Sequence, residues 1–489
     1  MEGRKSFLVL FGAAAAALVL FASVPAAFPQ DNVRILSLND AIKQAIKVNA
    51  EIKGAEFQAE VYRDKQKQAD ASRFPTIDLT AYGSLSPRAR LLNGSNGNPE
   101  STTDINRPSY DGVFGRADIV LIQPIYTFGK IDSYREAARH GVKAYEAGAR
   151  LKATDVALQV KEAYWGLLLG RELKGLLEDI SDQLDKATDK VQRQLNAGAP
   201  NVDEVDLYKL QTYQGELKKY MAMADEGINE AYYGLQLLTN NMGKKIDIKD
   251  KYLVPATVDL RDFDSYKKAA MKDRLEFLQL KEGLAAKKYL IKAKYADYFP
   301  QVFIAGLYSL AGATNRDHLN NPYITDEFNH AYGGAVVGFK WGMDFGIRKS
   351  KVSEARAEYM KLKMKQLYAM GGVPFQVKQA YLQLVEANSQ IKSLDDSYTK
   401  AKQWVVASLS NFDLGVGGAR DIADSVKAYA KIRADYFRAV FNQRMAIANL
   451  DHATGEDAYE IPYTVDKNPM KAVEEMEKQE KQEKQAGGE

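Results

Sequence analysis

The sequence predicts a mostly α-helical protein of two tandem repeats, each made of helices and one β-hairpin. Three observations support this fold class. Long Pro-free stretches place apolar residues at steps of three and four, segments of about ten residues alternate apolar and polar side chains, and the order of segments recurs later in the chain. Together they predict long helices joined to four strands.

The longest predicted helix runs from about Lys130 to Leu195, and a second one continues to about Asn240. The apolar residues of the first helix form a coiled-coil seam: Leu173, Leu176, Ile180, Leu184, Ala187, Val191 and Leu195. Between the two helices, Asn196–Asn201 reads as a tight turn in which Gly198 ends one helix and Pro200 prevents its continuation. A helix of this length spans about 100 Å, which no ordinary globular core requires.

The N-terminus reads as a secretory signal peptide over residues 1–27. Arg4 and Lys5 precede an apolar run, and small residues follow near Ala26 and Ala27. An uncleaved membrane anchor is the alternative, and five consecutive alanines argue against it. No later stretch approaches the roughly 18 apolar residues of a spanning helix. Residues 456–489 read as a charged tail.

Composition excludes several function classes. The 67 basic residues are interleaved with 64 acidic ones, which argues against a nucleic-acid-binding surface. The absence of cysteine excludes disulfides, zinc–thiolate sites and a lipidated cysteine. The histidines form no ligand-spaced pair, no Gly-rich phosphate loop follows a strand, and no nucleophile stands near a histidine. The sequence therefore predicts neither an enzyme nor a bound metal or cofactor.

The first repeat covers residues 36–240. Helices at about 36–49 and 51–73 end at Phe74-Pro75, strands follow at about 76–86 and 113–123, and Pro124 is expected to end the second strand. Helices then fill residues 130–240.

The second repeat covers residues 260–455. Its helices at 262–272 and 274–298 precede strands at about 301–311 and 332–344 and long helices over 347–453. Phe74-Pro75 recurs 225 residues later as Phe299-Pro300, and Phe128-Gly129 recurs 217 residues later as Phe345-Gly346. Such a sustained offset indicates an internal duplication. In this copy Gly371–Pro374 is expected to interrupt and kink the long helix.

Strands of about ten residues have the length that a tilted strand needs to cross a bilayer. The fourth strand places Val337, Phe339 and Trp341 on one face, which fits the lipid face of a membrane barrel. A small soluble sandwich is the alternative. Four strands cannot close a barrel, so membrane hairpins would have to pair between subunits.

In its motifs the chain resembles the TolC-like outer membrane factor family, over about residues 36–455. The resemblance rests on the Leu36–Asn49 opening, the two Phe-Pro helix ends, the passage from Pro124 to Gly129, the duplication, and Phe412–Gly415 followed by Asp421. It implies a mostly α-helical homotrimeric channel-tunnel, whose twelve strands form one barrel in the outer membrane and whose long helices form a periplasmic tunnel. It further implies an exit duct for a tripartite efflux pump or type I secretion system. Its partners would be a periplasmic adaptor and an inner-membrane pump or ABC transporter.

The resemblance also assigns candidate site residues. The two helical turns would be the tips that the adaptor contacts, at Gly198, Ala199, Pro200, Gly415, Val416 and Gly417. Asp421 and Asp424, with Glu204 in the first repeat, would form the acidic constriction of the periplasmic mouth, where rings of carboxylates favour cations. Alternatively, Asp421 is only a first-turn acid that complements the helix dipole.

Two other classes of protein have long helical hairpins. A periplasmic adaptor would lack the two membrane-type hairpins and the duplication. An exported structural coiled-coil protein without channel activity remains the alternative. The sequence does not indicate the substrate, which could be drugs, metals or proteins, nor the particular pump, nor the residues that hold the mouth closed.

Overall fold

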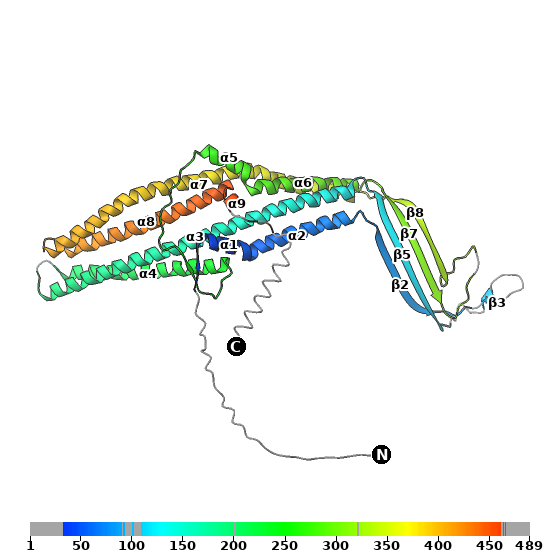
Figure 1. The fold of residues 1–489 in the computed structure, drawn as a ribbon, viewed down its shortest axis with the longest axis horizontal. Helices are drawn as coiled ribbons and strands as arrows, with labels where there is room; N and C mark the ends of the chain where they lie inside the picture. Colours follow the sequence, from blue (N-terminus) through cyan, green and yellow to red (C-terminus); the bar gives the residue numbers. More distant parts are fainter. Residues whose placement is uncertain are drawn as a thin grey trace, which may run out of the picture.

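The computed structural model describes residues 33–89, 91–92, 100–101, 109–199, 202–319, 322–460, 463 and 465. The molecule is elongated, with a β-sheet at one end and helices along the rest of its length (Figure 1). The expected signal peptide at 1–27, Pro200 in the first tip and nearly all of the charged tail lie outside the described residues.

The first half begins with a short β1 (Arg34–Leu36) that pairs in parallel with β6 (Ile246–Ile248). The other elements of this half follow in the predicted order, with β3 and β4 as an added two-stranded pair: α1 (Leu38–Val48), α2 (Ala50–Ala71), β2 (Thr76–Ser86), β3 (Leu91–Leu92), β4 (Glu100–Ser101), β5 (Gly112–Tyr126), α3 (Lys130–Asn196) and α4 (Glu204–Leu238). Ser37 and Asn49 cap the first two helices by accepting hydrogen bonds from the backbone amides of Asp40 and Glu51.

The second half repeats this order without the added pair. Its elements are α5 (Phe263–Asp273), α6 (Leu275–Ala296), β7 (Gln301–Ala313), β8 (His330–Lys340), α7 (Ile347–Asp413), α8 (Ala419–Thr454) and a short α9 (Asp457–Glu460). The two longest helices, α3 and α7, each contain 67 residues, so each is about 100 Å long. The mostly helical fold class is confirmed.

The predicted seam of α3 packs against α4 and α8. Leu176, Ile180, Leu184 and Val191 are buried in one apolar cluster with Leu210 of α4, while Leu173 and Leu195 pack at its margin. A second cluster around Tyr164 joins α1, α3 and β6. Burial of several such side chains, at about 1.5–3 kcal/mol each, holds each pair of long helices together.

The four long strands form one antiparallel sheet in the order β2-β5-β7-β8. Residues paired across an antiparallel ladder lie on the same face, so the register assigns every side chain to a face. One face carries an apolar set from all four strands: Ile77, Leu79, Leu85, Val113, Ile119, Leu121, Ile304, Leu310, Val337 and Phe339. The opposite face is mixed and includes Asp78, Thr80, Arg116, Asp118, Ser309 and Lys340.

Two predicted strand ends are wrong. The second strand continues through Pro124 to Tyr126. Strand β2 begins at Thr76, which pairs with Ile122, so beyond Ile122 strand β5 has a neighbouring strand on one side only. Proline is tolerated there because the side without a neighbour needs no N–H donor. The register with β7 shifts between Pro124 and Tyr126. The fourth strand ends at Lys340 rather than 344, because Asp344 accepts hydrogen bonds from the amides of Gly346 and Arg348 and starts α7.

Pro374 does not interrupt the long helix of the second half. Helix α7 is continuous from Ile347 to Asp413 and contains Gly371–Pro374. Val373 and Val377 beside the proline are buried against α5 and α8, and this packing offsets the loss of one backbone hydrogen bond. The expected interruption is therefore wrong, while a bend at this point stays a prediction.

Among the described residues, every helix is too short or too polar to cross a bilayer.

A partly buried histidine ties the end of α8 to α3. His452 Nε2 lies 3.3 Å from Asp155 of α3, and its Nδ1 lies 2.8 Å from Asp457 of α9. Burial opposes the charge on His452, but the hydrogen bonds and charges of the two carboxylates outweigh it and raise its pKa to about 9. The imidazolium therefore joins three helices at the middle of the molecule.

Because the folded pKa lies above the ordinary value of about 6.5, this interaction stabilises the fold fully below about pH 6.5 and is lost as pH rises through about 9. His452→Gln should remove on the order of 3 kcal/mol at pH 6 and flatten the decline in melting temperature between pH 7 and 9.5. Thermal unfolding in detergent measures this, with the exposed His318→Gln as control. An unchanged decline in His452→Gln would contradict the assignment.

Candidate functional site at the helical tips

Two helical turns lie at the end of the molecule that is opposite the sheet (Figure 1). Gly198 follows α3 and Gly415 follows α7, with φ angles of 66° and 76°, the left-handed region that glycine adopts without strain. The structure therefore places the described tip candidates in two turns at the same end of the molecule: Gly198, Ala199, Gly415, Val416 and Gly417.

The second turn requires a small residue at a particular position. The amides of Val416 and Gly417 both donate to the carbonyl oxygen of Asn411, at 3.0 Å each. A Cβ atom on Gly417 would lie 2.9 Å from Cβ of Asn411 and 3.1 Å from its backbone carbon. Glycine at 417 thus permits the chain to reverse within a few residues and start α8 at Ala419.

The three candidate carboxylates have different surroundings. Asp421, in the first turn of α8, is exposed, and its side chain has no partner among the described residues. Asp424, one turn later, accepts hydrogen bonds from Lys209 Nζ at 3.1 Å and Tyr213 Oη at 3.2 Å, both on α4. Glu204 is exposed in the first turn of α4 and is 3.5 Å from Tyr208 Oη. Only Asp424 connects the two halves of the chain.

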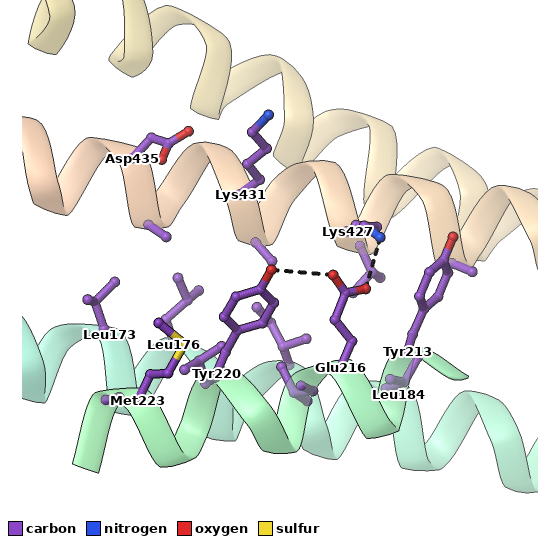
Figure 2. Close-up of a pocket in the computed structure, with 18 of the residues that line it drawn as sticks. Leu173, Leu176, Leu184, Tyr213, Glu216, Tyr220, Met223, Lys427, Lys431 and Asp435 are labelled. Atoms are coloured by element: carbon purple, nitrogen blue, oxygen red, sulfur yellow. Dashed lines mark hydrogen bonds and ion pairs between the residues drawn. The ribbon is translucent and has the colours of Figure 1, made fainter. Parts of the chain in front are cut away.

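Two further ion pairs join the halves near the tips. Lys190 of α3 pairs with Asp413 at the end of α7. Glu216 of α4 pairs with Lys427 of α8 at 2.9 Å, and the hydroxyl of Tyr220 donates to the same carboxylate (Figure 2). The hydrogen bond from Lys427 lowers the pKa of Glu216. We call the pairs Lys190–Asp413, Lys209–Asp424 and Glu216–Lys427 the tip bridges.

An apolar cavity of about 440 Å³ lies beside the tip bridges, between α3, α4 and α8. Figure 2 shows leucines of α3 and aromatic residues of α4 facing α8 across it. On α8 the lining includes three alanines, Ala423, Ala430 and Ala434, which leave the space unfilled. The contact between α8 and the first-half helices is therefore incompletely packed at this level.

Sequence reasoning identified the turns and the acids but missed Lys190, Lys209, Tyr213 and Lys427. Each contacts a residue more than 200 positions away, and the contact depends on how the two helical pairs lie against each other. One signal in the sequence could have predicted the contact between Lys209 and Asp424. Both residues follow their glycine turns by a similar number of residues, so they lie at a similar height along their helices.

The described residues contain no cluster of three side chains suited to a metal ion. What the site offers instead is a set of weak ion pairs between two rigid helical pairs. Exposed ion pairs contribute about 0–1 kcal/mol each, and the buried apolar contacts of α8 with α3 and α4 add to them.

Comparisons with known proteins agree with this architecture. Residues 41–217 match the family model described as outer membrane efflux protein. The fold is similar to a crystal structure of CusC, with a TM-score of 0.69 and 16% identity over 86% of this chain and 93% of that one. It is also similar to the Campylobacter jejuni CmeC outer membrane channel, with a TM-score of 0.70 and 17% identity over 89% of each chain.

A third similar structure is the outer membrane protein VceC from Vibrio cholerae, with a TM-score of 0.67 and 12% identity over 86% of this chain and 96% of that one. A comparison of the sequence with curated proteins gives no match. The solved structures are too distant in sequence to show more than the fold.

The tip bridges should set the distance between α4 and α8. Because the chain has no cysteine, spin labels can be placed at Val205→Cys and Arg420→Cys alone. Lys209→Gln with Asp424→Asn should broaden and lengthen the measured distance distribution, since both partners of one bridge lose their charge. Lys218→Gln, an exposed lysine on the same helix, is the control. Identical distributions in all variants would show that the bridges do not hold the tips together.

Proposed function

We propose that this chain, which belongs to the TolC-like outer membrane efflux protein family, is the exit duct of a tripartite efflux pump or type I secretion system. In this proposal three copies assemble so that their sheets form one barrel in the outer membrane and their long helices form a tunnel in the periplasm. An adaptor contacts the tips, and an inner-membrane transporter supplies the substrate.

The observation that carries the proposal is the continuous apolar face of the sheet. In the single chain, the side chains of Leu79, Val337 and Phe339 on this face are 67%, 75% and 71% exposed. A large exposed apolar patch normally marks a protein interface or a membrane contact. The mixed opposite face would line the lumen. The strands of 11–15 residues are long enough to cross a bilayer when tilted.

Aromatic side chains gather where the strands meet the helices. Phe128 and Phe299 stack with ring centroids 5.1 Å apart, and Tyr126 packs edge-on against Phe128. Trp341 follows β8, is 51% exposed, and donates from Nε1 to the carbonyl oxygen of Tyr298 at 3.1 Å. Aromatic residues at this level support a membrane–water interface at the junction of sheet and helices.

The tips support the role of a mouth that opens. Three copies of the α7–α8 turn would surround the axis, with Asp421 unpaired and exposed while Asp424 is held by α4 of its own subunit. Asp421 is then the carboxylate available to a passing cation, and Asp424 acts by keeping α8 against α4. Glu204, at the other turn, adds negative charge near the adaptor contact.

A charge on the apolar sheet face should prevent assembly in the membrane. Leu79→Lys should cost about 2–4 kcal/mol if its side chain faces lipid near mid-bilayer, and should reduce the amount of outer membrane trimer. Thr80→Lys, the next residue on the opposite face, should leave it unchanged. Mass measurement in detergent should give three chains for the wild type. Equal tolerance of both lysines, or a monomer that conducts ions in a bilayer, would refute the proposal.

The two aspartates near the second turn should have separable effects. Asp421→Asn should lower cation selectivity with little change in open probability, because it removes an unpaired carboxylate. Asp424→Asn should raise open probability, because it frees Lys209 and Tyr213. The double variant should combine both effects without loss of trimers. Single-channel recordings with and without multivalent cations measure them, and unchanged selectivity in the double variant would mean that these acids only serve their helix.

A further inference from the structure

Within the sheet, the two repeats of the chain meet at one boundary. Strand β5 of the first repeat pairs there with β7 of the second repeat, and we call this the inner boundary. In the duplication, β8 corresponds to β5 and β2 corresponds to β7, and these two strands lie at opposite edges of the sheet (Figure 1). If copies close into a ring, β8 of one copy meets β2 of the next, so the boundary between copies should repeat the inner boundary.

An aromatic contact marks the inner boundary where the strands join the helices. Phe128 follows β5 and Phe299 precedes β7, and their rings stack with centroids 5.1 Å apart and an angle of 12° between the planes. The stack leaves the two side chains 39% and 41% exposed. This contact therefore fastens the end of one hairpin to the beginning of the next.

The duplication places a phenylalanine at both corresponding positions on the outer edges. Phe345 corresponds to Phe128 at the offset of 217 residues, and Phe74 corresponds to Phe299 at the offset of 225. The backbone is also alike at the two Phe-Pro sequences, because the amides of Phe74 and Phe299 each donate to the carbonyl oxygen three residues earlier, at 2.9 and 3.1 Å. Both members of the inner stack thus have a counterpart.

The two counterparts do not meet each other within one chain. Phe74 comes directly before β2 and Phe345 shortly after β8, so β5 and β7 lie between them. Phe74 is 69% exposed and Phe345 is fully exposed. In the part of the chain that the structure describes, neither ring contacts another aromatic ring. Large apolar side chains exposed at both edges indicate a surface that a partner covers.

The ion pair beside the inner stack is not repeated at the outer edges. Lys130 pairs with Asp297 at 2.7 Å across the inner boundary. Their counterparts, at the same two offsets, are Ile347 and Ser72, which cannot form an ion pair.

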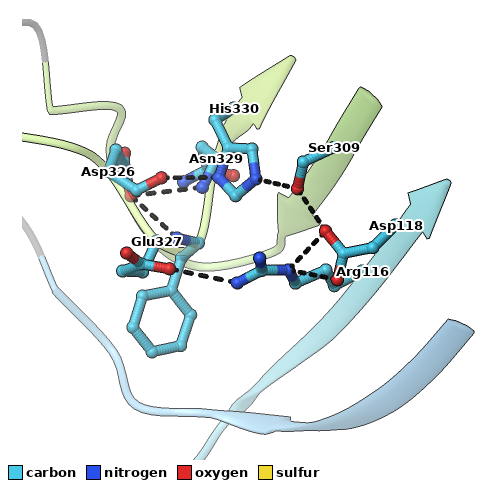
Figure 3. Close-up of polar contacts among 8 residues, drawn as sticks. Arg116, Asp118, Ser309, Asp326, Glu327, Asn329 and His330 are labelled. Atoms are coloured by element: carbon cyan, nitrogen blue, oxygen red, sulfur yellow. Dashed lines mark hydrogen bonds and ion pairs between the residues drawn. The ribbon is translucent and has the colours of Figure 1, made fainter. Parts of the chain in front are cut away.

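A polar contact nearer the outer end of the inner boundary is not repeated either. Ser309 Oγ of β7 lies 2.5 Å from the carboxylate of Asp118 on β5 (Figure 3). The corresponding place in β8 holds Ala335 and Val336, whose side chains accept no hydrogen bond. The pair of phenylalanines is therefore the contact of the inner boundary that the duplication preserves.

We propose that Phe345 of one copy stacks on Phe74 of the next copy, at the level where the sheet joins the helices. The two rings belong to different surfaces of the chain, so the contact is head-to-tail and each boundary of a closed ring contains one. The Phe-Pro sequence then has the same role in both repeats, because it supplies the ring on which the preceding hairpin stacks. This inference rests on the proposed assembly of three copies and does not depend on transport.

Cross-linking between introduced cysteines tests the contact, because the chain has no cysteine of its own. In the full-length protein in detergent, a short bis-maleimide should join Phe74→Cys/Phe345→Cys chains into linked dimers and trimers on a denaturing gel. Each single variant should keep the size of one chain, since the contact joins two different positions. Phe128→Cys/Phe299→Cys is the matched control, whose cross-link should lie within one chain.

The outcomes separate this contact from the proposed function. Trimers that conduct ions but give no linked chains would overturn the contact and leave the duct standing, with lipid as the cover of the two rings. Linked chains from a protein that does not conduct ions would support the contact and refute the duct. A wild type that stays a single chain by mass measurement would refute both.

The rate of trimer dissociation tests the same contact without cysteines. Phe74→Ser and Phe345→Ser should each speed dissociation in dodecyl sulfate about tenfold, as expected for loss of an aromatic pair and the surface that it buries. The double variant should dissociate no faster than either single variant, because each change already removes the same contact. Tyr252→Ser, which alters an exposed aromatic residue between β6 and α5, should match the wild type. Effects that multiply in the double variant would show that the two rings do not touch.

Discussion

The structure depends on a sheet that one chain cannot complete. Among the strands that the structure describes, β2 and β8 are the two ends of the strand order, so each has one backbone edge without a neighbouring strand, and the apolar face between them is exposed. Unpaired edges and exposed apolar faces are both unfavourable in water. In the proposed trimer, pairing between copies within a bilayer would satisfy both requirements at once. The long helices α3 and α7 begin shortly after β5 and β8 end and carry the chain away from the sheet.

The helical part combines interactions of two strengths. Within each half, seams such as Leu176, Ile180, Leu184 and Val191 bury a leucine or valine at almost every turn, and each contributes about 1.5–3 kcal/mol. Between the halves, the tip bridges are exposed or half-exposed and contribute about 0–1 kcal/mol each, and the apolar cluster of α3 and α4 also takes in Phe412, Ile422 and Val426 of the second half. The cavity between α3, α4 and α8 lies at this boundary between the two halves.

The two ends of the molecule use related chemistry for different purposes. At the tips, lysine–carboxylate pairs join α-helices of the two halves. At the far end of the sheet, Ser309 Oγ contacts the carboxylate of Asp118, and His330 Nδ1 contacts the carbonyl oxygen of Asp326. His452 in the middle of the molecule, between Asp155 and Asp457, keeps its charge because two carboxylates face it.

The sequence by itself determined the elements, because these depend on local periodicity. The seam of α3, the Phe-Pro helix ends, the four strands and the glycine turns were all readable from residue spacing, and the duplication supported the order of elements. Errors arose where a neighbouring strand or helix changed the local rule: Pro124 is tolerated because one side of β5 is free there, and Pro374 is tolerated because Val373 and Val377 are packed. Only the tertiary structure decided which side chains meet. Lys209 with Asp424, and Ser309 with His330, depend on the approach of segments whose relative positions no local pattern encodes.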